Sequence, residues 1–428
     1  MSDPITIERL DAQQRLAVEK MLDQSQRIVG ITGPAGSGKT TIMRLAIDSL
    51  RNAGYSPAVA APTGKAARRV KEATGSDAKT LHALLKYTRP TEIDEKTGKP
   101  YGDTFPRHDR EHPLEDIDHV ICDEYAMVNH ELHRNLIDAF PPGCRLICLG
   151  DNSQLPPIER AALASKPSPF TDVLTRFNGV TLERVHRQAA DSGILFNAQR
   201  VLKGLAPQQR DDFVMTITDK PIDAVIDAVG HADFASLDNQ IITPINRSWI
   251  GTVKLNQTLQ NVLMDSNRPT INLPRNKWDK QQLRIGVGDK VIMTKNWYDM
   301  PCEDGSSGVF NGETGIVTEI SDVEEVVVDF GDRVCRIPPA MQTVYQNNVM
   351  VVYPQRDLYL AYVVTTHKAQ GSEYKNVIYV LNKSAAAALN RRNMYTALTR
   401  ARDHVRFITD MGSLSMSLTR KEPMVFGE

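Results

Sequence analysis

The chain has 428 residues, 41% of them hydrophobic and 24% charged, which is a globular composition with enough apolar residues for roughly two to four domains. Its formal net charge is −1, so binding to nucleic acid would depend on a local basic surface and not on a large positive field. The amino-terminal residues do not resemble a signal peptide, and no apolar run approaches the ~20 residues that cross a bilayer. We therefore expect a cytoplasmic protein that does not bind membranes.

Five cysteines are scattered along the chain without the paired spacing of a metal site. The closest two, Cys144 and Cys148, have no second Cys or His pair nearby that could complete a ligand set. We expect all five to be reduced and mostly buried, as is usual in the cytoplasm. They are Cys122, Cys144, Cys148, Cys302 and Cys335.

The most specific local pattern is Gly-Pro-Ala-Gly-Ser-Gly-Lys-Thr-Thr at residues 33–41. It follows an apolar run, residues 27–32, and precedes a helical pattern, which is the context of a phosphate-binding loop and not of a chance glycine-rich hairpin. In such a loop, backbone N–H groups face the phosphates, Lys39 reaches the β- and γ-phosphates, and the Thr40 hydroxyl binds Mg²⁺. The sequence therefore predicts ATP and Mg²⁺ as cofactors. The predicted ATP contacts in this loop are Gly33, Pro34, Ala35, Gly36, Ser37, Gly38, Lys39, Thr40 and Thr41.

Two later apolar runs end in polar side chains that suit a nucleotide site. Residues 119–122 precede Asp123 and Glu124, and residues 145–150 precede a loop that contains Gln154. At the carboxyl edge of a parallel sheet, Asp123 would hold Mg²⁺ through water, Glu124 would orient or deprotonate the attacking water, and Gln154 would sense the γ-phosphate. The alternatives are a chance Asp-Glu pair and a solvated glutamine in a proline-terminated loop.

The stretch between these runs, residues 86–118, is polar and rich in proline and charge. Residues 95–99 read Glu-Lys-Thr-Gly-Lys, which is typical of a turn between two short strands. We therefore predict a β-hairpin inserted in the first domain. One large apolar residue, Phe105, lies among its polar neighbours.

The second half of the chain predicts another α/β region, which starts at Val180 and has apolar runs at residues 240–244, 358–364 and 377–381. Residues 283–340 interrupt it with alternating β patterns and tight Gly-Asp and Asn-Gly turns, which are typical of a small barrel. The predicted fold class is α/β, with two parallel-sheet domains, a hairpin inserted in the first and a β-barrel in the second. The predicted boundaries are 1–85 and 119–178 for the first domain, 86–118 for the hairpin, 179–280 and 358–428 for the second domain, and 281–357 for the barrel.

Two arginines in the second half are candidates for stabilising a phosphoryl group during its transfer. Arg187 lies in the segment Leu-Glu-Arg-Val-His-Arg-Gln, and Arg400 lies in Tyr-Thr-Ala-Leu-Thr-Arg-Ala-Arg. The alternative for each is an ordinary surface arginine, so either one alone is a weak indication.

In this order the segments resemble the motifs of the superfamily 1 helicases, in the 5′→3′ class of RecD-like enzymes and, within it, the Dda-like phage helicases. The resemblance extends over about residues 10–408 and is specific because of the ordered set. It assigns residues 10–14 to the glutamine motif, 33–41 to motif I, 61–67 to motif Ia, 80–82 to motif Ib, 123–124 to motif II, 150–157 to motif III, Arg187 to motif IV, 365–373 to motif V and 395–402 to motif VI.

The resemblance implies two RecA-like domains that use ATP together, with an SH3-like barrel in the second. It also implies that Gln14 reads the adenine base and that Gln370, Gly371 and Glu373 contribute to nucleotide binding. The family's barrel pattern, Val-Phe-Asn-Gly-x-x-Gly-Ile-Val, is matched at residues 309–317.

The residues after Asp123 and Glu124 depart from the family pattern. The family usually has a small residue and then a serine, whereas this chain has Tyr125 and Ala126. No role is therefore transferred for that serine. The barrel segment is also shorter than in some relatives, so partner contacts of a larger barrel are not transferred either.

Small and polar side chains at strand-to-helix corners suit hydrogen bonds to phosphates and sugars without reading bases. Phe105 is expected either to stack on the terminal base pair as a strand-separating wedge or to anchor the hairpin, and both possibilities stay open. The predicted DNA contacts are Pro62, Thr63, Gly64, Lys65, Thr80, His82, Phe105, Asn246, Thr366 and His367.

The expected activity is ATP-dependent 5′→3′ DNA unwinding, with Lys39, Glu124, Gln154, Arg187 and Arg400 as catalytic residues. The expected partners are single-stranded and duplex DNA, with a single-strand-binding protein or replisome component as a further candidate, and the expected state is a monomer. An RNA helicase and a protein-remodelling ATPase are the alternatives. A nucleotide-gated binding module without hydrolysis is disfavoured by the full set of catalytic residues.

Overall fold

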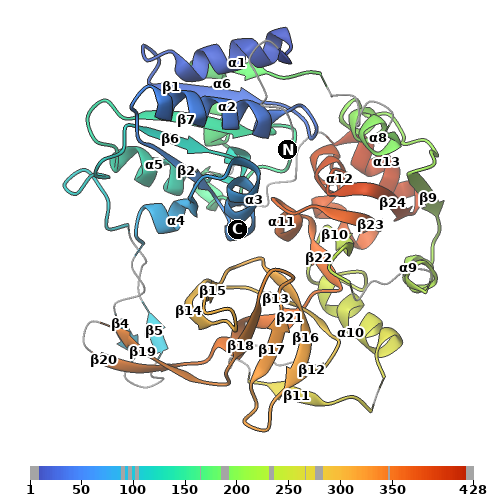
Figure 1. Ribbon diagram of the computed structural model, residues 1–428. Coiled ribbons are helices and arrows are strands. Elements are labelled where there is room, and N and C mark those ends of the chain that lie inside the picture. Colours follow the sequence, from blue (N-terminus) through green and yellow to red (C-terminus); the bar gives the residue numbers. More distant parts are fainter. Residues whose placement is uncertain are drawn as a thin grey trace. The chain divides into compact units, whose positions relative to one another are not determined.

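In the computed structural model the chain divides into two compact units, one of residues 1–191 with 425–428 and one of residues 192–424 (Figure 1). Each unit contains a parallel β-sheet covered by helices, which confirms the predicted α/β class. No helix in the described ranges is long and apolar enough to cross a bilayer. The structure describes residues 9–87, 92–94, 99–101, 106–163, 165–184, 192–230, 236–265, 267–274, 283–345 and 348–420.

The first unit is built on a six-stranded parallel sheet. Its strands are β1 (Ile28–Thr32), β2 (Pro57–Ala61), β3 (Ala78–Thr80), β6 (His119–Cys122), β7 (Arg145–Gly150) and β8 (Val180–Thr181), and its helices are α1 (Ala12–Leu22), α2 (Lys39–Asn52), α3 (Gly64–Thr74), α4 (Leu81–Leu84), α5 (His130–Asp138) and α6 (Pro169–Arg176). The strand order is β3-β2-β6-β7-β1-β8. Because side chains alternate along a strand, Ile121 and Ile147 pack with α1 and α2, while Val120 and Leu146 pack with α5 and α6. The sheet is thus apolar on both faces, which is why its strands appear in the sequence as continuous apolar runs.

The first unit continues further along the chain than predicted. β8 pairs in parallel with β1, with Val180 opposite Ile31, and Val180 and Leu182 join the core formed with α1 and α2. The prediction that Val180 starts the second α/β region is therefore wrong. A strand of only two residues is too short to show a period, so the sequence could not indicate which sheet it completes.

The inserted hairpin is confirmed by the short strands β4 (Glu92–Asp94) and β5 (Lys99–Tyr101). They pair antiparallel, with Asp94 opposite Lys99 and Glu92 opposite Tyr101. The predicted turn at residues 95–98 lies outside the described residues.

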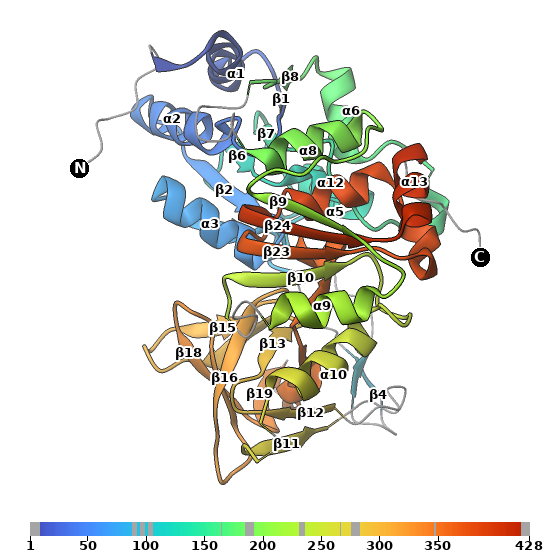
Figure 2. The same ribbon diagram turned by 90° about the vertical axis from the view of Figure 1, so that its right-hand side faces the viewer.

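The second unit is built on a five-stranded parallel sheet in the order β22-β10-β23-β24-β9. Its strands are β9 (Phe213–Ile217), β10 (Asn239–Thr243), β22 (Val363–Thr365), β23 (Tyr374–Val380) and β24 (Ala401–Thr409), and its helices are α8 (Gly193–Leu202), α9 (Pro221–Val229), α10 (Thr252–Leu263), α11 (Thr366–Ala369), α12 (Arg391–Leu398) and α13 (Met411–Thr419). Ile378 and Val380 belong to the core that includes α9, whereas Val377 and Tyr379 belong to the core that includes α8 and α12. Figure 2 shows these helices on opposite sides of β23 and β24.

A small antiparallel sheet, the predicted barrel, is inserted in the second unit in the order β18-β17-β16-β13-β21. Its strands are β13 (Lys290–Met293), β16 (Thr314–Ile320), β17 (Val326–Asp329), β18 (Val334–Ile337) and β21 (Leu358–Leu360), accompanied by the two-stranded ribbons β11 (Thr270–Leu273) with β12 (Leu283–Gly286), β14 (Trp297–Pro301) with β15 (Ser307–Val309), and β19 (Met341–Tyr345) with β20 (Asn348–Val352). Its interior is continuous with the face of the parallel sheet that carries α9, since Val291 and Val328 belong to the same core as Ile241 and Ile378. The strand patterns at residues 288–293, 309–317 and 325–330 are thus confirmed, and the β19–β20 ribbon was not predicted.

Only two residues, Ala361 and Tyr362, connect the barrel strand β21 to the parallel strand β22. β21 pairs with β13, while β22 pairs with β10, so the apolar run at residues 358–364, predicted to belong wholly to the second α/β domain, forms two strands in different sheets. The Ala361 N–H donates to the Lys290 carbonyl oxygen (2.8 Å), and the Tyr362 hydroxyl donates to Asp289 Oδ1 (2.6 Å). The link is fully buried and apolar, and for that reason nothing in the sequence marks the change of sheet.

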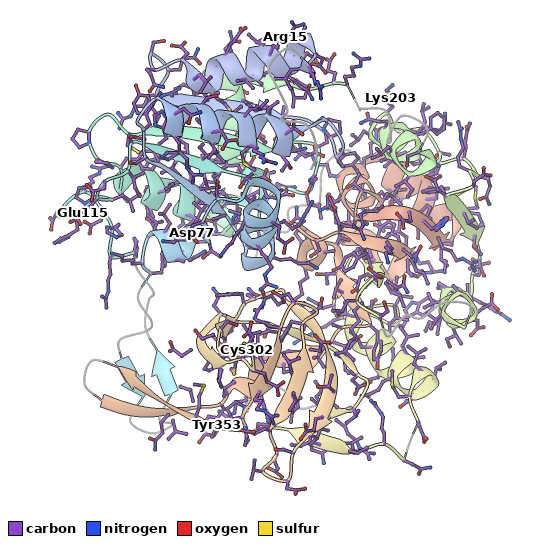
Figure 3. All side chains as sticks on the ribbon, in the orientation of Figure 1. Arg15, Asp77, Glu115, Lys203, Cys302 and Tyr353 are labelled. Carbon is purple, nitrogen blue, oxygen red and sulfur yellow. A yellow bond between two sulfur atoms is a disulfide. The ribbon has the colours of Figure 1, made fainter. Side chains whose placement is uncertain are left out.

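Cys302 and Cys335 form a disulfide with an S–S distance of 2.16 Å, which lies near the Cys302 label in Figure 3. The prediction that all five cysteines are reduced is therefore wrong for this pair. The two residues are 33 positions apart, and an antiparallel bridge between them brings them together, a proximity that spacing in the sequence does not show. The other three, Cys122, Cys144 and Cys148, are free and buried in the first unit.

A buried ion pair fixes the segment between β15 and β16. Arg333 Nη2 lies 2.6 Å from Glu313 Oε2, and the two side chains are only 6% and 4% exposed. Arg333 also donates to the Gly308 carbonyl oxygen (2.9 Å), and Glu313 accepts from the Phe310 N–H (3.0 Å). Arg333 Nη1 also pairs with the exposed Asp332 (3.0 Å), so Glu313 is the buried one of its two carboxylate partners.

Glu313→Gln should lower the free energy of unfolding by about 3 kcal/mol, because it leaves the Arg333 charge buried with weaker compensation. Urea unfolding followed by circular dichroism measures this loss. The matched control is Glu303→Gln, which breaks the exposed pair Glu303–Arg336 (2.8 Å) and should cost less than about 1 kcal/mol. Equal losses in the two variants would show that burial does not distinguish the pairs.

Candidate nucleotide and nucleic-acid sites

The phosphate-binding loop joins β1 to α2. Gly38 has a left-handed backbone (φ 85°) and is followed by Lys39, the first residue of α2. Gly33 leaves no room for a side chain, since an added Cβ would lie 2.6 Å from Ser37 Oγ. Lys39 Nζ donates to the carbonyl oxygens of Gly33 (2.7 Å) and Pro34 (2.9 Å), so the ammonium group lies across the loop where phosphate oxygens would replace these acceptors.

Three loops meet at the carboxyl edge of the first sheet, because β6, β7 and β1 are neighbours and parallel. The Gly33 N–H donates to the Gly150 carbonyl oxygen (3.1 Å), and the Asn152 N–H donates to Thr32 Oγ1 (3.0 Å). An added Cβ on Gly150 would lie 3.2 Å from the backbone nitrogen of Tyr125. The three segments are therefore packed backbone against backbone, with little freedom to separate.

Asp123 and Glu124 follow β6 directly. Glu124 has a left-handed backbone (φ 51°, ψ 35°), which is uncommon for a residue with a side chain and turns the chain sharply at the end of the strand. Burial raises the pKa of Asp123 to about 6, the Glu124 charge adds to this rise, and Lys39 opposes it. Both carboxyl groups line a cavity of about 290 Å³, together with Thr40, Ala66, Arg69, Val70, Glu72 and Ala73.

The oxygen atoms of Thr40 and Asp123 in this cavity fit Mg²⁺, which prefers hard oxygen ligands. A divalent cation would also stabilise the charged form of the Asp123 carboxyl, which burial disfavours. In the described part of the chain no three His, Cys, Asp or Glu side chains gather into a metal site of their own.

Gln154 lies in the loop after β7 with its side chain 5% exposed. Its Oε1 atom, like Ser37 Oγ in the phosphate loop, has no hydrogen-bond partner among the residues that the structure describes. Buried polar atoms are rarely left unpaired, because each costs the free energy of removing it from water. Two such atoms at one sheet edge are suited to a polar ligand that binds there.

Gln14, the predicted adenine reader, is buried at the start of α1. Its Nε2 atom donates to the Ser37 carbonyl oxygen (3.0 Å), and its backbone N–H donates to Asp11 Oδ1 (2.8 Å), which caps the helix.

The neighbouring Gln13 was not predicted from the sequence. Its Nε2 donates to Glu183 Oε2 (3.3 Å), and its Oε1 accepts from the Glu183 N–H (2.8 Å), so it ties α1 to the segment after β8. Only its position beside Gln14 could have drawn attention to it.

The departure from the family pattern after Glu124 has a visible structural role. Tyr125 is fully buried, its hydroxyl oxygen lies 2.7 Å from His133 Nδ1, and its ring lies 6.1 Å from that of Phe170. Tyr125 therefore anchors the turn after Glu124 to both α5 and α6. Burial lowers the pKa of His133, so this hydrogen bond is made by a neutral imidazole near neutral pH.

The predicted DNA contacts of the first unit lie at two corners that follow the neighbouring strands β2 and β3. Residues 62–65 form the corner before and at the start of α3, and Thr80 and His82 form the corner at α4. The hydroxyl oxygens of Thr63 and Thr80 accept backbone N–H groups and cap these helices. Each hydroxyl keeps its own proton for donation to a phosphate. Burial lowers the pKa of His82, so it is neutral near neutral pH.

The predicted DNA contacts of the second unit lie after the neighbouring strands β10 and β22. Asn246 is exposed, and its Oδ1 accepts from the Thr252 hydroxyl (2.9 Å). His367 is half-buried, and burial lowers its pKa. Thr366 is fully buried, and its hydroxyl donates to Asn393 Oδ1 (2.7 Å). A contact of Thr366 with DNA would therefore have to come from its backbone.

Arg400 follows Thr399, the residue that caps the carboxyl-terminal end of α12, and is 3% exposed. Its guanidinium donates to the carbonyl oxygens of Thr396 (3.0 Å) and Ser372 (3.3 Å) and to Thr399 Oγ1 (3.2 Å). These three acceptors hold it inside the second unit. To reach a phosphate, the side chain would have to exchange these internal partners for phosphate oxygens.

The structure thus groups the predicted residues into two sets, one at the carboxyl edge of each sheet. Gln370 and Gly371 are buried and Glu373 is exposed in the turn between α11 and β23. Arg187 and Phe105 lie outside the described residues. Asn393, on α12, was not singled out from the sequence, although a polar residue on a helix face that packs inward was the available signal.

Three family models match successive parts of the chain. Residues 9–213 match an AAA domain, residues 255–330 match the SH3 domain of ATP-dependent RecD-like DNA helicases, and residues 360–408 match the UvrD-like helicase C-terminal domain. The second match begins within α10 and covers the barrel as far as β17, and the third contains the segments assigned to motifs V and VI.

The sequences of two known helicases also align with this chain. The ATP-dependent RecD2 DNA helicase of Deinococcus radiodurans is 30% identical over 391 residues, which cover 90% of this chain and 47% of that protein. The ATP-dependent DNA helicase dda of Enterobacteria phage T4 is 33% identical over 155 residues, 36% of this chain and 33% of that protein. The chain thus matches less than half the length of either relative.

Among solved structures, one of Pif1 helicases unwinding forked duplex DNA superimposes with a TM-score of 0.60 at 20% identity, over 93% of this chain and 92% of that chain. This likeness shows a common fold.

Below about pH 6, the affinity for Mg²⁺ during nucleotide binding should fall roughly tenfold per pH unit, because a proton on Asp123 competes with the cation. The sign follows from the raised pKa: the carboxyl group is ionised above this pH and protonated below it. Titration of Mg²⁺ against a fluorescent ATP analogue between about pH 5 and pH 7.5 measures the effect. Asp123→Asn, which lacks the titrating group, isolates the protonation of the nucleotide itself. The same pH dependence in both proteins would assign the effect to ATP alone.

Proposed function

Because the chain belongs to the RecD-like superfamily 1 helicases, we propose that it is an ATP-dependent DNA helicase that moves 5′→3′ on single-stranded DNA and unwinds duplex DNA. The observation that contributes most is the convergence of the phosphate loop, the Asp123–Glu124 pair and Gln154 at the ends of β1, β6 and β7. A binding module without turnover would not need a carboxylate beside the metal-binding oxygens and a polar sensor on the next strand.

Each side chain at this edge has a proposed role in hydrolysis. Lys39 would exchange its two carbonyl acceptors for β- and γ-phosphate oxygens. Thr40 and Asp123 would hold Mg²⁺, which neutralises charge on the phosphates when bound. Glu124 would orient the attacking water and accept its proton, and Gln154 would donate to or accept from the γ-phosphate region with its buried amide.

The two arginines would stabilise the negative charge that develops during phosphoryl transfer. Arg187 is proposed for this role from the motif resemblance. Arg400 is proposed from the resemblance and from its placement, since it is held by three neutral acceptors and not by a carboxylate. A guanidinium paired only with neutral groups gives up less interaction energy when it moves to a phosphate.

The corners after β2 and β3 in the first unit, and after β10 and β22 in the second, are proposed to hold the DNA backbone. Their hydroxyl, amide and imidazole groups suit phosphate and sugar contacts and do not read bases. The β4–β5 hairpin is proposed as the strand separator, with Phe105 as its wedge. Binding to a single-strand-binding protein or replisome component, and action as a monomer, are further proposals that rest on the resemblance alone.

An RNA helicase is the second candidate, because contacts to phosphates do not by themselves distinguish ribose from deoxyribose. Single-stranded DNA should raise the rate of ATP hydrolysis, whereas RNA of the same length and a protein substrate should not.

Glu124→Gln should lower kcat about 10²-fold or more while ATP and DNA still bind, because the base is lost and the side-chain volume is kept.

The control for that variant is Glu72→Gln, which lies in the same cavity but is exposed and should hydrolyse ATP like the wild type. Steady-state hydrolysis with and without each nucleic acid, together with filter binding, provides all these measurements. Stimulation by RNA equal to that by DNA would favour the RNA helicase. Hydrolysis indifferent to both would contradict the proposed function.

Directional unwinding is a separate expectation. Duplexes with a 5′ single-stranded tail should be unwound much faster than duplexes of the same sequence with a 3′ tail, because translocation is proposed to run 5′→3′ toward the junction. Strand displacement of fluorescently labelled forks measures both rates, and a blunt duplex controls for opening without a loading strand. Preferential unwinding of 3′-tailed duplexes would refute the proposed polarity.

A further inference from the structure

Asn393, on α12 two residues before motif VI, connects this helix to motif V inside the second unit. The Thr366 hydroxyl, at the start of α11, donates to Asn393 Oδ1 (2.7 Å) on α12. The Tyr379 hydroxyl, on β23, donates to the same oxygen (2.9 Å). Asn393 is also fixed to its own helix, since its backbone N–H donates to the side chain of the capping residue Asn390 (2.9 Å).

All three side chains of this cluster are buried, with Thr366 and Tyr379 fully enclosed and Asn393 1% exposed. Water cannot replace their hydrogen bonds there, so breaking the cluster leaves polar atoms unpaired in an apolar core. Three polar residues at such positions are unexpected for stability alone, because apolar side chains of the same size would pack as well. What the cluster adds is a fixed geometry between α11 and α12.

A second contact joins the same two motifs at the other end of α12. Arg400 Nη1 donates to the carbonyl oxygen of Ser372, in the turn that follows α11 (3.3 Å). The amino-terminal end of α12 is thus held to the start of motif V by Asn393, and its carboxyl-terminal end is held to the end of motif V by Arg400. A displacement of α11 therefore cannot leave α12 and Arg400 in place without breaking buried hydrogen bonds.

We infer that Asn393 is a positioning residue that couples DNA binding at motif V to the placement of Arg400 for ATP hydrolysis. The inference rests on the proposed function, in which His367 and its neighbours on α11 contact the DNA backbone. The structure shows Arg400 bonded to Thr396, Ser372 and Thr399, and the proposed function adds a second arrangement in which it is released to a phosphate. DNA that shifts α11 changes the balance between them through Asn393, which gives the coupling a physical two-state element.

Asn393→Leu tests the inference, because leucine has a similar volume and cannot accept a hydrogen bond. Stimulation of kcat by single-stranded DNA should fall about tenfold, within the range usual for coupled sites, while the affinity for DNA changes little. The variant should also melt at a lower temperature, since the Tyr379 hydroxyl loses its acceptor and the Thr366 hydroxyl keeps only the longer contact with the Thr243 carbonyl oxygen (3.5 Å). A second variant, Asn393→Leu with Tyr379→Phe, removes the unpaired Tyr379 hydroxyl and should recover part of the melting temperature without recovering stimulation.

The matched control is Tyr379→Phe alone. It removes one hydrogen bond from the same buried cluster but keeps the link from Thr366 to Asn393, so DNA stimulation should stay close to that of the wild type. If stimulation instead follows the melting temperature across the three variants, Asn393 is only structural and the inference is wrong. If the wild type itself shows no stimulation by DNA, the proposed function fails, and the inference fails with it.

Discussion

The parallel pairing of β6, β7 and β1 is the constraint on which the rest of the first site depends. Parallel strands all end at the same edge of a sheet, so the segments at residues 33–41, 123–124 and 150–157 share one surface although they are far apart in the chain. Gly33 and Gly150 keep these segments at backbone contact distance, because neither position has room for a side chain. The precision of the site is therefore set by the sheet and not by the loops themselves.

The same constraint holds three residues at this edge in states that are unfavourable without a ligand. The backbone of Glu124 is left-handed, the pKa of Asp123 is raised by burial, and Gln154 has a buried oxygen without a partner in the described part of the chain. Each of these features is unfavourable alone. They persist because the packed core beneath the edge, including Tyr125 between α5 and α6, leaves the turn no other conformation.

Much of the fold could be predicted from the sequence because its signals are local. The phosphate loop has a fixed spacing, and the buried parallel strands are apolar runs. The barrel strands show alternating apolar and polar residues and are separated by tight turns. The failures concern which distant segments meet. Periodicity reports that residues 358–364 are buried but not that they serve two sheets, and the two-residue strand at Val180 has no period at all. Spacing likewise gives no indication that Cys302 bonds Cys335.

For the candidate site, residues that follow strands at motif spacing were selected from the sequence, since the proposed chemistry requires those residue types at those positions. Asn393 and Gln13 were not, because each acts through a partner far away in the sequence, Thr366 in one case and Glu183 in the other. Such partners become visible only when the chain is folded, and the Thr366 hydroxyl, which had been expected to face DNA, turns out to face the core.

The short connection between β21 and β22 holds the barrel strand and the parallel strand in a fixed geometry. Ala361 and Tyr362 are fully buried, and they are hydrogen-bonded on the barrel side to Lys290 and Asp289 and on the sheet side to the Gln240 side chain, which donates to both of their carbonyl oxygens (3.0 and 2.9 Å). A hinge needs a few residues free to change their backbone angles, and this link has none to spare. We therefore expect the barrel strand β21 and the strand β22, which leads into the corner where motif V begins, to move together.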